Sequence, residues 1–147
     1  MTDWIQRNLE QVFSLPAPAV EWLTALYGVI QVFDDAADGD PIERAELDKA
    51  ILDSLVRMPV NQFFLTYPAA LSAALQTMVL KWQASDRLER DGNAGPKAYM
   101  WRAGYFDVVL LVVSLCHGPE VAQEAAHLVL ELYGESLEDY MKEFENA

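Results

Sequence analysis

Helical periodicity is the feature of this sequence that most restricts its fold. Between the glycine and proline residues, apolar side chains recur at the three- and four-residue spacing of one face of an α-helix. Asp38-Gly39 and Asp91-Gly92 are pairs that could turn a β-hairpin, but each follows a segment with helical periodicity. The sequence therefore predicts an all-α fold: a single domain over residues 1–147, built as a bundle of six or seven helices.

Two segments of the chain are expected at the centre of this bundle. Residues 17–37 and residues 96–117 are apolar around most of the helical circumference. A helix of that kind is nearly surrounded by other parts of the chain. We therefore predict two largely buried central helices.

A third helix is expected to follow directly. Gly39 suits the left-handed position after a helix, and Asp40-Pro41 then supplies an N-cap and a first-turn proline. The predicted helix ends near Arg57, before Pro59. The apolar residues expected to face the core are Leu47, Ile51, Leu52 and Leu55.

The charge of the chain restricts its partners. With 10 Lys and Arg against 23 Asp and Glu, the net charge is −13. Affinity for phosphate is built from basic side chains, so direct binding of nucleic acid is not expected, whereas a basic protein or bound cations would suit this surface.

Other features of the composition bear on the location of the protein. The single cysteine, Cys116, cannot form an internal disulfide, and the most apolar segment is about half as long as a membrane span. We expect a soluble cytoplasmic protein with no membrane contact. The sequence leaves its oligomeric state open, a homodimer included.

Three aspartates stand out near the end of the first central helix. Asp34, Asp35 and Asp38 occupy an arc of about 100° on one helix, so their carboxylates can converge. Each negative charge in a last helical turn costs about 0.3 to 1 kcal/mol. A divalent cation such as Mg²⁺ would offset that cost through oxygen ligands. The alternative is a solvated acidic corner or an ion-pair site.

Three residues elsewhere are candidates for the same site. Asp86 follows the apolar stripe of the helix that Pro68 begins and could be a fourth metal ligand, or it could belong to a solvated helix end. Asn61 could offer an amide oxygen to a ligand. Arg102 lies on an apolar helix and needs an acidic or phosphate partner. A buried Arg–Asp or Arg–Glu pair is favoured over a phosphate clamp.

Two resemblances bear on function. The run Asp34-Asp35-Ala36-Ala37-Asp38 resembles the first aspartate-rich motif of class I isoprenoid synthases, which implies magnesium and a diphosphate ligand. Longer blocks resemble small helical proteins of tailed bacteriophages, which implies a phage origin and the host cytoplasm. These blocks are residues 32–40, 58–64 and 81–86, Arg102, and residues 140–143.

These observations lead to three expected functions. The first is a phage-type protein that binds Mg²⁺ through Asp34, Asp35, Asp38 and Asp86, with a phosphorylated small molecule as ligand. The second is a non-enzymatic acidic protein that binds a basic host protein surface, and the third is a virion or assembly component. Enzymatic activity is left open: a reaction would be metal-assisted chemistry at a diphosphate, and no pattern supports hydrolysis by a side-chain nucleophile.

Overall fold

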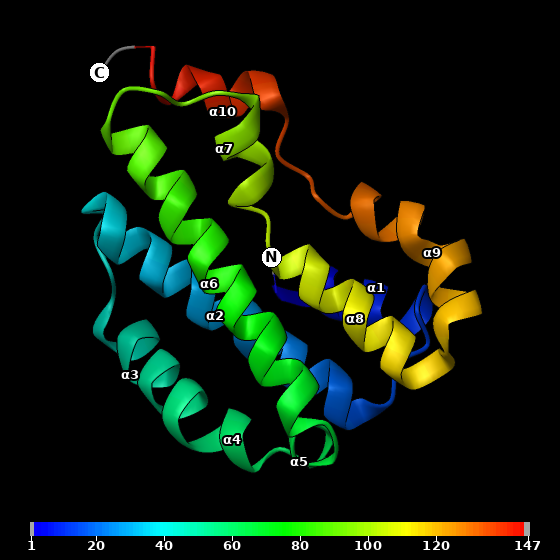
Figure 1. Cartoon of the computed structure of the whole chain (residues 1–147). Coiled ribbons are helices and arrows are strands. Elements are labelled where there is room, and N and C mark those ends of the chain that lie inside the picture. Colours follow the sequence, from blue (N-terminus) through cyan, green and yellow to red (C-terminus); the bar gives the residue numbers. More distant parts are fainter. Residues whose placement is uncertain (1, 146–147) are drawn as a thin grey trace. The chain divides into compact units, whose positions relative to one another are not determined.

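The computed structural model describes residues 2–145, and all regular secondary structure in that range is helical (Figure 1). The predicted all-α fold is confirmed. The chain forms two compact units that divide after Pro68. The single domain over residues 1–147 stays a prediction. Within residues 2–145, no helix combines the length and the apolar character needed to cross a membrane.

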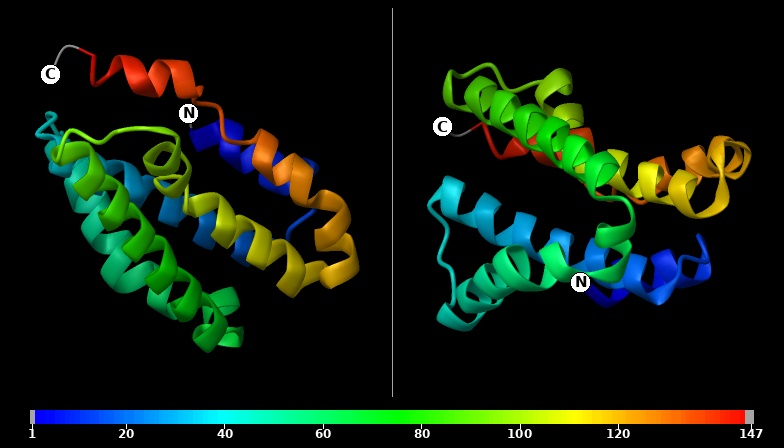
Figure 2. Two further views of the ribbon diagram at one scale, coloured as in Figure 1. Left: turned by 45° about the horizontal axis from the view of Figure 1, so that its top comes forward. Right: turned by 60° about the horizontal axis from the view of Figure 1, so that its bottom comes forward.

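The first unit is organised around one long helix. Its elements are α1 (Thr2–Gln11), α2 (Ala17–Asp38), α3 (Arg44–Leu52), the π-helical turn η1 (Asp53–Arg57), α4 (Met58–Val60) and α5 (Gln62–Thr66). The helices α1, α3 and α5 and the turn η1 all contact α2, and the chain from α3 to α4 runs back beside it (Figure 2). The predicted central helix over residues 17–37 is therefore confirmed, with its end at Asp38.

The end of α2 is closed by backbone hydrogen bonds. Gly39 adopts a left-handed conformation with φ of 75°, as predicted, and its N–H donates to the carbonyl of Ala36. The N–H of Asp40 donates to the carbonyl of Asp35 over 2.9 Å. This pair of bonds is a Schellman motif. Asp40 thus belongs to the end of α2, and its predicted role as N-cap of the next helix is wrong, since α3 begins only at Arg44 with Glu43 before it.

The predicted third helix continues past its expected end. The backbone widens into η1, where the N–H of Met58 donates to the carbonyl of Asp53, five residues earlier. Pro59 is the second residue of α4 and has no N–H to donate to the preceding turn, which the wider η1 directly before it accommodates.

The residues of this segment that face the core also differ from the predicted ones. Ala50, Asp53 and Met58 are its buried residues. The apolar residues that were expected to face the core are exposed instead: Leu47, Ile51, Leu52 and Leu55. The smaller Ala50 lies on the buried side of α3, and the larger aliphatic side chains remain on the other side.

The second unit contains the other predicted central helix, but in two pieces. Its elements are α6 (Pro68–Arg90), α7 (Pro96–Trp101), α8 (Tyr105–His117), α9 (Pro119–Glu131) and α10 (Leu137–Lys142). The helix predicted over residues 96–117 is interrupted between α7 and α8. The interruption includes Gly104, where an added Cβ would lie 3.1 Å from Cγ and 3.3 Å from Cα of Met78 on α6. A side chain at this position would be unusually close to α6, and Met78 would have to shift by a few tenths of an ångström to make room for it.

Candidate functional site

The aspartate-rich end of α2 is the site that the sequence singles out. Asp34 and Asp35 are half-buried and Asp38 is exposed. Among the residues that the structure describes, no three acidic, histidine or cysteine side chains are placed to hold one metal ion together. Magnesium binding by this cluster stays a prediction.

A melting experiment tests the magnesium prediction. If Asp34 ligates an ion, millimolar Mg²⁺ or Mn²⁺ should raise the melting temperature by several degrees, because a ligand that binds only the folded state stabilises it. Asp34→Asn should remove that gain. Glu120→Gln, which alters an exposed acid on α9, should keep it. The prediction would be contradicted if neither Mg²⁺ nor Mn²⁺ changed the melting temperature of the wild-type protein.

Two other predicted site residues have structural partners. The Asp86 carboxylate pairs with Arg90 one helical turn later, over 2.9 Å. The Asn61 side-chain oxygen accepts hydrogen bonds from the N–H groups of Phe63 and Phe64 and so caps α5, while its Nδ2 donates to the carbonyl of Pro18. Asn61 therefore ties the start of α5 to the start of α2.

Arg102 lies in a cluster of charged and aromatic groups in the second unit. Its guanidinium is 3.8 Å from Glu89 on α6 and 3.7 Å from Glu143, and its Cζ lies 5.2 Å from the ring centroid of Tyr140. The Tyr140 hydroxyl donates to Glu89 over 2.9 Å. Burial and then this hydrogen bond raise the pKa of Tyr140, so the hydroxyl stays protonated. The contacts are those of the Arg–Glu pair that the sequence favoured over a phosphate clamp.

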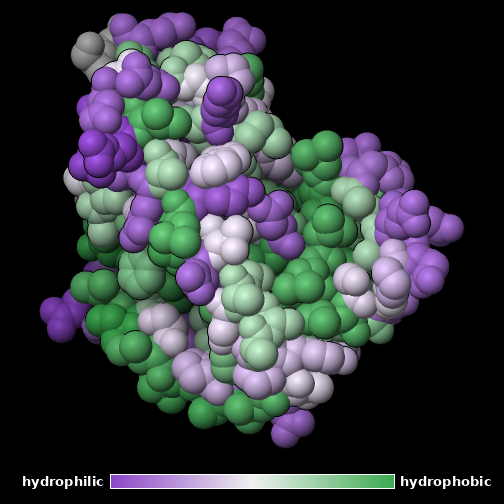
Figure 3. All heavy atoms as spheres, in the orientation of Figure 1, coloured by the Kyte–Doolittle hydropathy of each residue, from purple (hydrophilic) through white to green (hydrophobic). Residues whose placement is uncertain are grey.

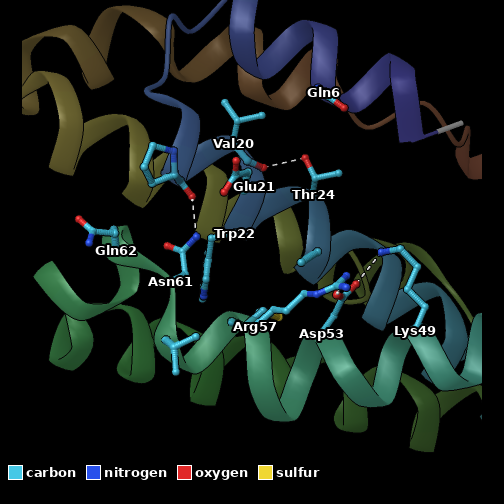
Figure 4. Close-up of a pocket in the computed structure, with 14 residues that line it drawn as sticks. Gln6, Val20, Glu21, Trp22, Thr24, Lys49, Asp53, Arg57, Asn61 and Gln62 are labelled. Carbon is cyan, nitrogen blue, oxygen red and sulfur yellow. Dashed lines mark hydrogen bonds and ion pairs between the residues drawn. The ribbon is translucent and has the colours of Figure 1, made fainter.

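The first unit contains a pocket that sequence reasoning did not predict. Its volume is about 560 Å³, which is in the range of small-molecule sites (Figure 4). The start of α2 forms one side, and the chain from α3 to α5 forms the other. Its apolar lining residues are Pro18, Val20, Trp22, Ala25, Met58 and Val60, and its polar ones are Gln6, Glu21, Thr24, Lys49, Asp53, Arg57, Asn61 and Gln62.

A buried carboxylate with two cations borders this pocket. The side chain of Asp53 is only 4% exposed and accepts from Lys49 over 2.6 Å and from Arg57 over 3.2 Å. Both cations are mainly exposed, Arg57 to 61%. Asp53 is also the first residue of the π-helical turn, a distortion that is frequent at functional sites. The pocket edge thus has a buried acid that pairs with two largely exposed cationic side chains.

The pocket wall also contains an unpaired hydrogen-bond donor. Trp22 is 1% exposed, and its indole stacks on Phe64 with a centroid distance of 6.0 Å. Among the described residues, Trp22 Nε1 is the buried side-chain polar atom that has no hydrogen-bond partner. In Figure 4 the indole extends from α2 toward the chain around Arg57 and Asn61, with its nitrogen end foremost. A buried N–H without an acceptor costs about 1–3 kcal/mol.

The sequence contained one signal for part of this pocket. Lys49, Asp53 and Arg57 follow each other at four-residue intervals, the spacing of ion pairs on a helix. The position of Trp22 opposite them had no such signal, because it depends on how α2 packs on η1.

Comparison with models of protein families, with curated proteins and with solved structures finds no match to this chain. The resemblances to class I isoprenoid synthases and to phage proteins, and the cytoplasmic location, stay predictions.

Proposed function

We propose that this protein binds a small molecule in the pocket of its first unit, and that the molecule has a mainly apolar body with one hydrogen-bond acceptor. The observation that carries the proposal is the indole N–H of Trp22, which is buried in the pocket wall without an acceptor among the described residues. A ligand that brings an acceptor to this atom would remove the cost of the unmade hydrogen bond.

The lining supports a ligand with this division between apolar and polar parts. Val20, Ala25, Met58 and Val60 offer apolar surface, and burying the body of the ligand against them supplies the main driving force. The side-chain oxygens of Asn61 and Asp53 already accept hydrogen bonds from groups of the chain itself. We therefore do not expect them to be the main polar contacts of the ligand.

The route of the acceptor to Trp22 requires a local movement. Trp22 Nε1 is closed to solvent, so the acceptor must displace part of the pocket wall. Met58 and Arg57 have long, unbranched side chains with several rotatable bonds and are the residues that can move at low cost. Arg57 can also pair with an anionic acceptor while it remains near Asp53.

Nuclear magnetic resonance tests the proposal directly. The chain has four tryptophans, so its proton–nitrogen spectrum should contain four indole signals, and Trp22→Phe identifies that of Trp22. The probes are naphthoate, naphthamide and naphthalene, which share one apolar body and differ in their acceptor. The first two should move the Trp22 proton downfield and bind more tightly than naphthalene.

A variant measures the contribution of the hydrogen bond. Trp22→Phe keeps an aromatic ring but removes the N–H, and should weaken naphthoate binding by about two- to tenfold. Trp101→Phe, on the exposed Trp101 of α7, is the matched control and should not change the affinity. Equal affinity for all three probes, or a Trp22 signal that none of them moves, would show that the proposal is wrong.

A further inference from the structure

An exposed apolar surface lies on the first unit, apart from the pocket. It consists of five residues of α3 and η1, which we call the α3–η1 apolar face: Leu47, Ile51, Leu52, Leu55 and Val56. Leu55 alone is 73% exposed. Figure 3 shows apolar residues gathered at the lower left, over the part of the chain that contains α3 and α4. Contiguous apolar surface of this kind is typical of interaction sites.

The π-helical turn helps to keep this face in line. A step of four residues on an α-helix advances about 40° beyond one full turn, so a row at that spacing drifts around the helix. The wider turn of η1 reduces the drift between Ile51 and Leu55, and Leu47, Ile51 and Leu55 form one row. Such a row presents the anchor spacing by which one helix packs on another.

The surroundings of this face are strongly acidic. Eight acidic and three basic residues lie between positions 34 and 57. All three bases pair with acids one helical turn away: Arg44 with Asp48, and Lys49 and Arg57 with Asp53. Within the part of the chain that the structure describes, four of the acids have no ion-pair partner: Asp35, Asp40, Glu43 and Glu46. Glu46 is next to Leu47 in the sequence and Glu43 lies four residues before it, so unneutralised carboxylates lie near the start of the apolar row.

We propose that the α3–η1 apolar face docks a basic amphipathic helix of another protein. The apolar row takes the apolar side of that helix, and the free carboxylates attract the lysines and arginines that flank it. A second copy of this chain fits less well, because it would bring the same carboxylates against each other. The proposal does not depend on a ligand in the pocket, since Trp22 and Asp53 lie outside this face.

A synthetic peptide tests the proposal on the full chain. The probe is a helical peptide with leucines at three- and four-residue spacing and lysines beside them, and the control peptide has glutamates in place of the lysines. The lysine peptide should bind, with an affinity that falls as salt concentration rises. The glutamate peptide should not bind measurably.

Variants then locate the binding on the surface. The double variant Ile51→Ser, Leu55→Ser should weaken binding of the lysine peptide by at least about tenfold, as expected when two anchor residues are lost. Glu43→Gln with Glu46→Gln should weaken it several-fold and flatten its salt dependence. Leu130→Ser changes a leucine of α9 that is 62% exposed and should leave the affinity unchanged.

Three outcomes would overturn this assignment. The first is equal binding of both peptides, and the second is equal loss of affinity in the Leu130→Ser control. The third is dimerisation of the free protein, measured by light scattering, that disappears in the Ile51→Ser, Leu55→Ser variant. Circular dichroism should give the same helix content for all variants, because the exchanged residues are exposed.

Discussion

Tyr140→Ala is expected to lower the free energy of unfolding by about 3–5 kcal/mol. Tyr140 is fully buried, and its ring contacts those of Tyr99 and Phe144 with centroid distances of 5.5 Å and 5.1 Å. Its hydroxyl also donates to Glu89, and Arg102 lies over its ring. Alanine would leave a cavity and would detach α10 from the rest of the second unit. Urea denaturation followed by circular dichroism measures the loss.

Two control variants separate the ring from the hydroxyl. Tyr140→Phe keeps the ring and removes the hydrogen bond to Glu89, so it should cost about 1–3 kcal/mol. Phe33→Ala removes an exposed aromatic side chain from α2 and should change stability by no more than about 0.5 kcal/mol. If Tyr140→Ala costs no more than Phe33→Ala, the packing of α10 described above is wrong.

Trp22→Ala should have an effect of similar size in the first unit, a loss of about 3–5 kcal/mol. The indole is almost completely buried and stacks on Phe64 of α5. Its removal would leave a large cavity between α2 and the segment that returns beside it. The same urea denaturation measures the effect.

The comparison with phenylalanine makes this prediction specific. Trp22→Phe should cost less than Trp22→Ala, because it keeps an aromatic ring and breaks no hydrogen bond that the described residues make. Trp101→Ala, at a tryptophan that is 51% exposed and whose ring contacts Lys81, should cost much less than Trp22→Ala. A large loss for Trp22→Phe would mean that its N–H has an acceptor in the folded protein, and the basis of the proposed ligand site would then be removed.

Many helix boundaries could be predicted because they depend on a few neighbouring residues. Pro68 begins α6, Gly118-Pro119 separates α8 from α9, and the Ser136 hydroxyl accepts from the N–H of Asp139 at the start of α10. Each of these is a local preference of the backbone or of a capping side chain. Asp40 shows where local reasoning fails, because its residue type suits both the end of α2 and the start of α3. In the structure its N–H donates to the carbonyl of Asp35, so Asp40 belongs to the end of α2.

The buried face of α3 could not be predicted in the same way. Leu47, Ile51 and Leu55 have the periodicity of a core face, yet Ala50 and Asp53 are the residues that are buried. Periodicity ranks the faces of a helix by hydrophobicity, whereas burial also depends on which face fits the neighbouring helix.

The candidate sites also differ in whether a short stretch of sequence could predict them. The sequence directed attention to Asp34, Asp35 and Asp38 because charges that crowd one helical turn are visible in a short stretch of residues. The pocket joins Trp22 with Asp53 and Arg57, which are more than thirty residues away in the sequence. No pattern within either segment predicts their meeting.

The amino-acid sequence was enough to predict the helical class, several helix ends and the excess of acidic residues. These properties follow from backbone preferences, apolar spacing and charge, which act within a few residues or simply add along the chain. The packing of the helices determines which face of α3 is exposed and where the helix predicted over residues 96–117 breaks. It also leaves the Trp22 N–H buried without an acceptor among the described residues. Those outcomes depend on competition for space and hydrogen bonds between segments that are far apart in the sequence.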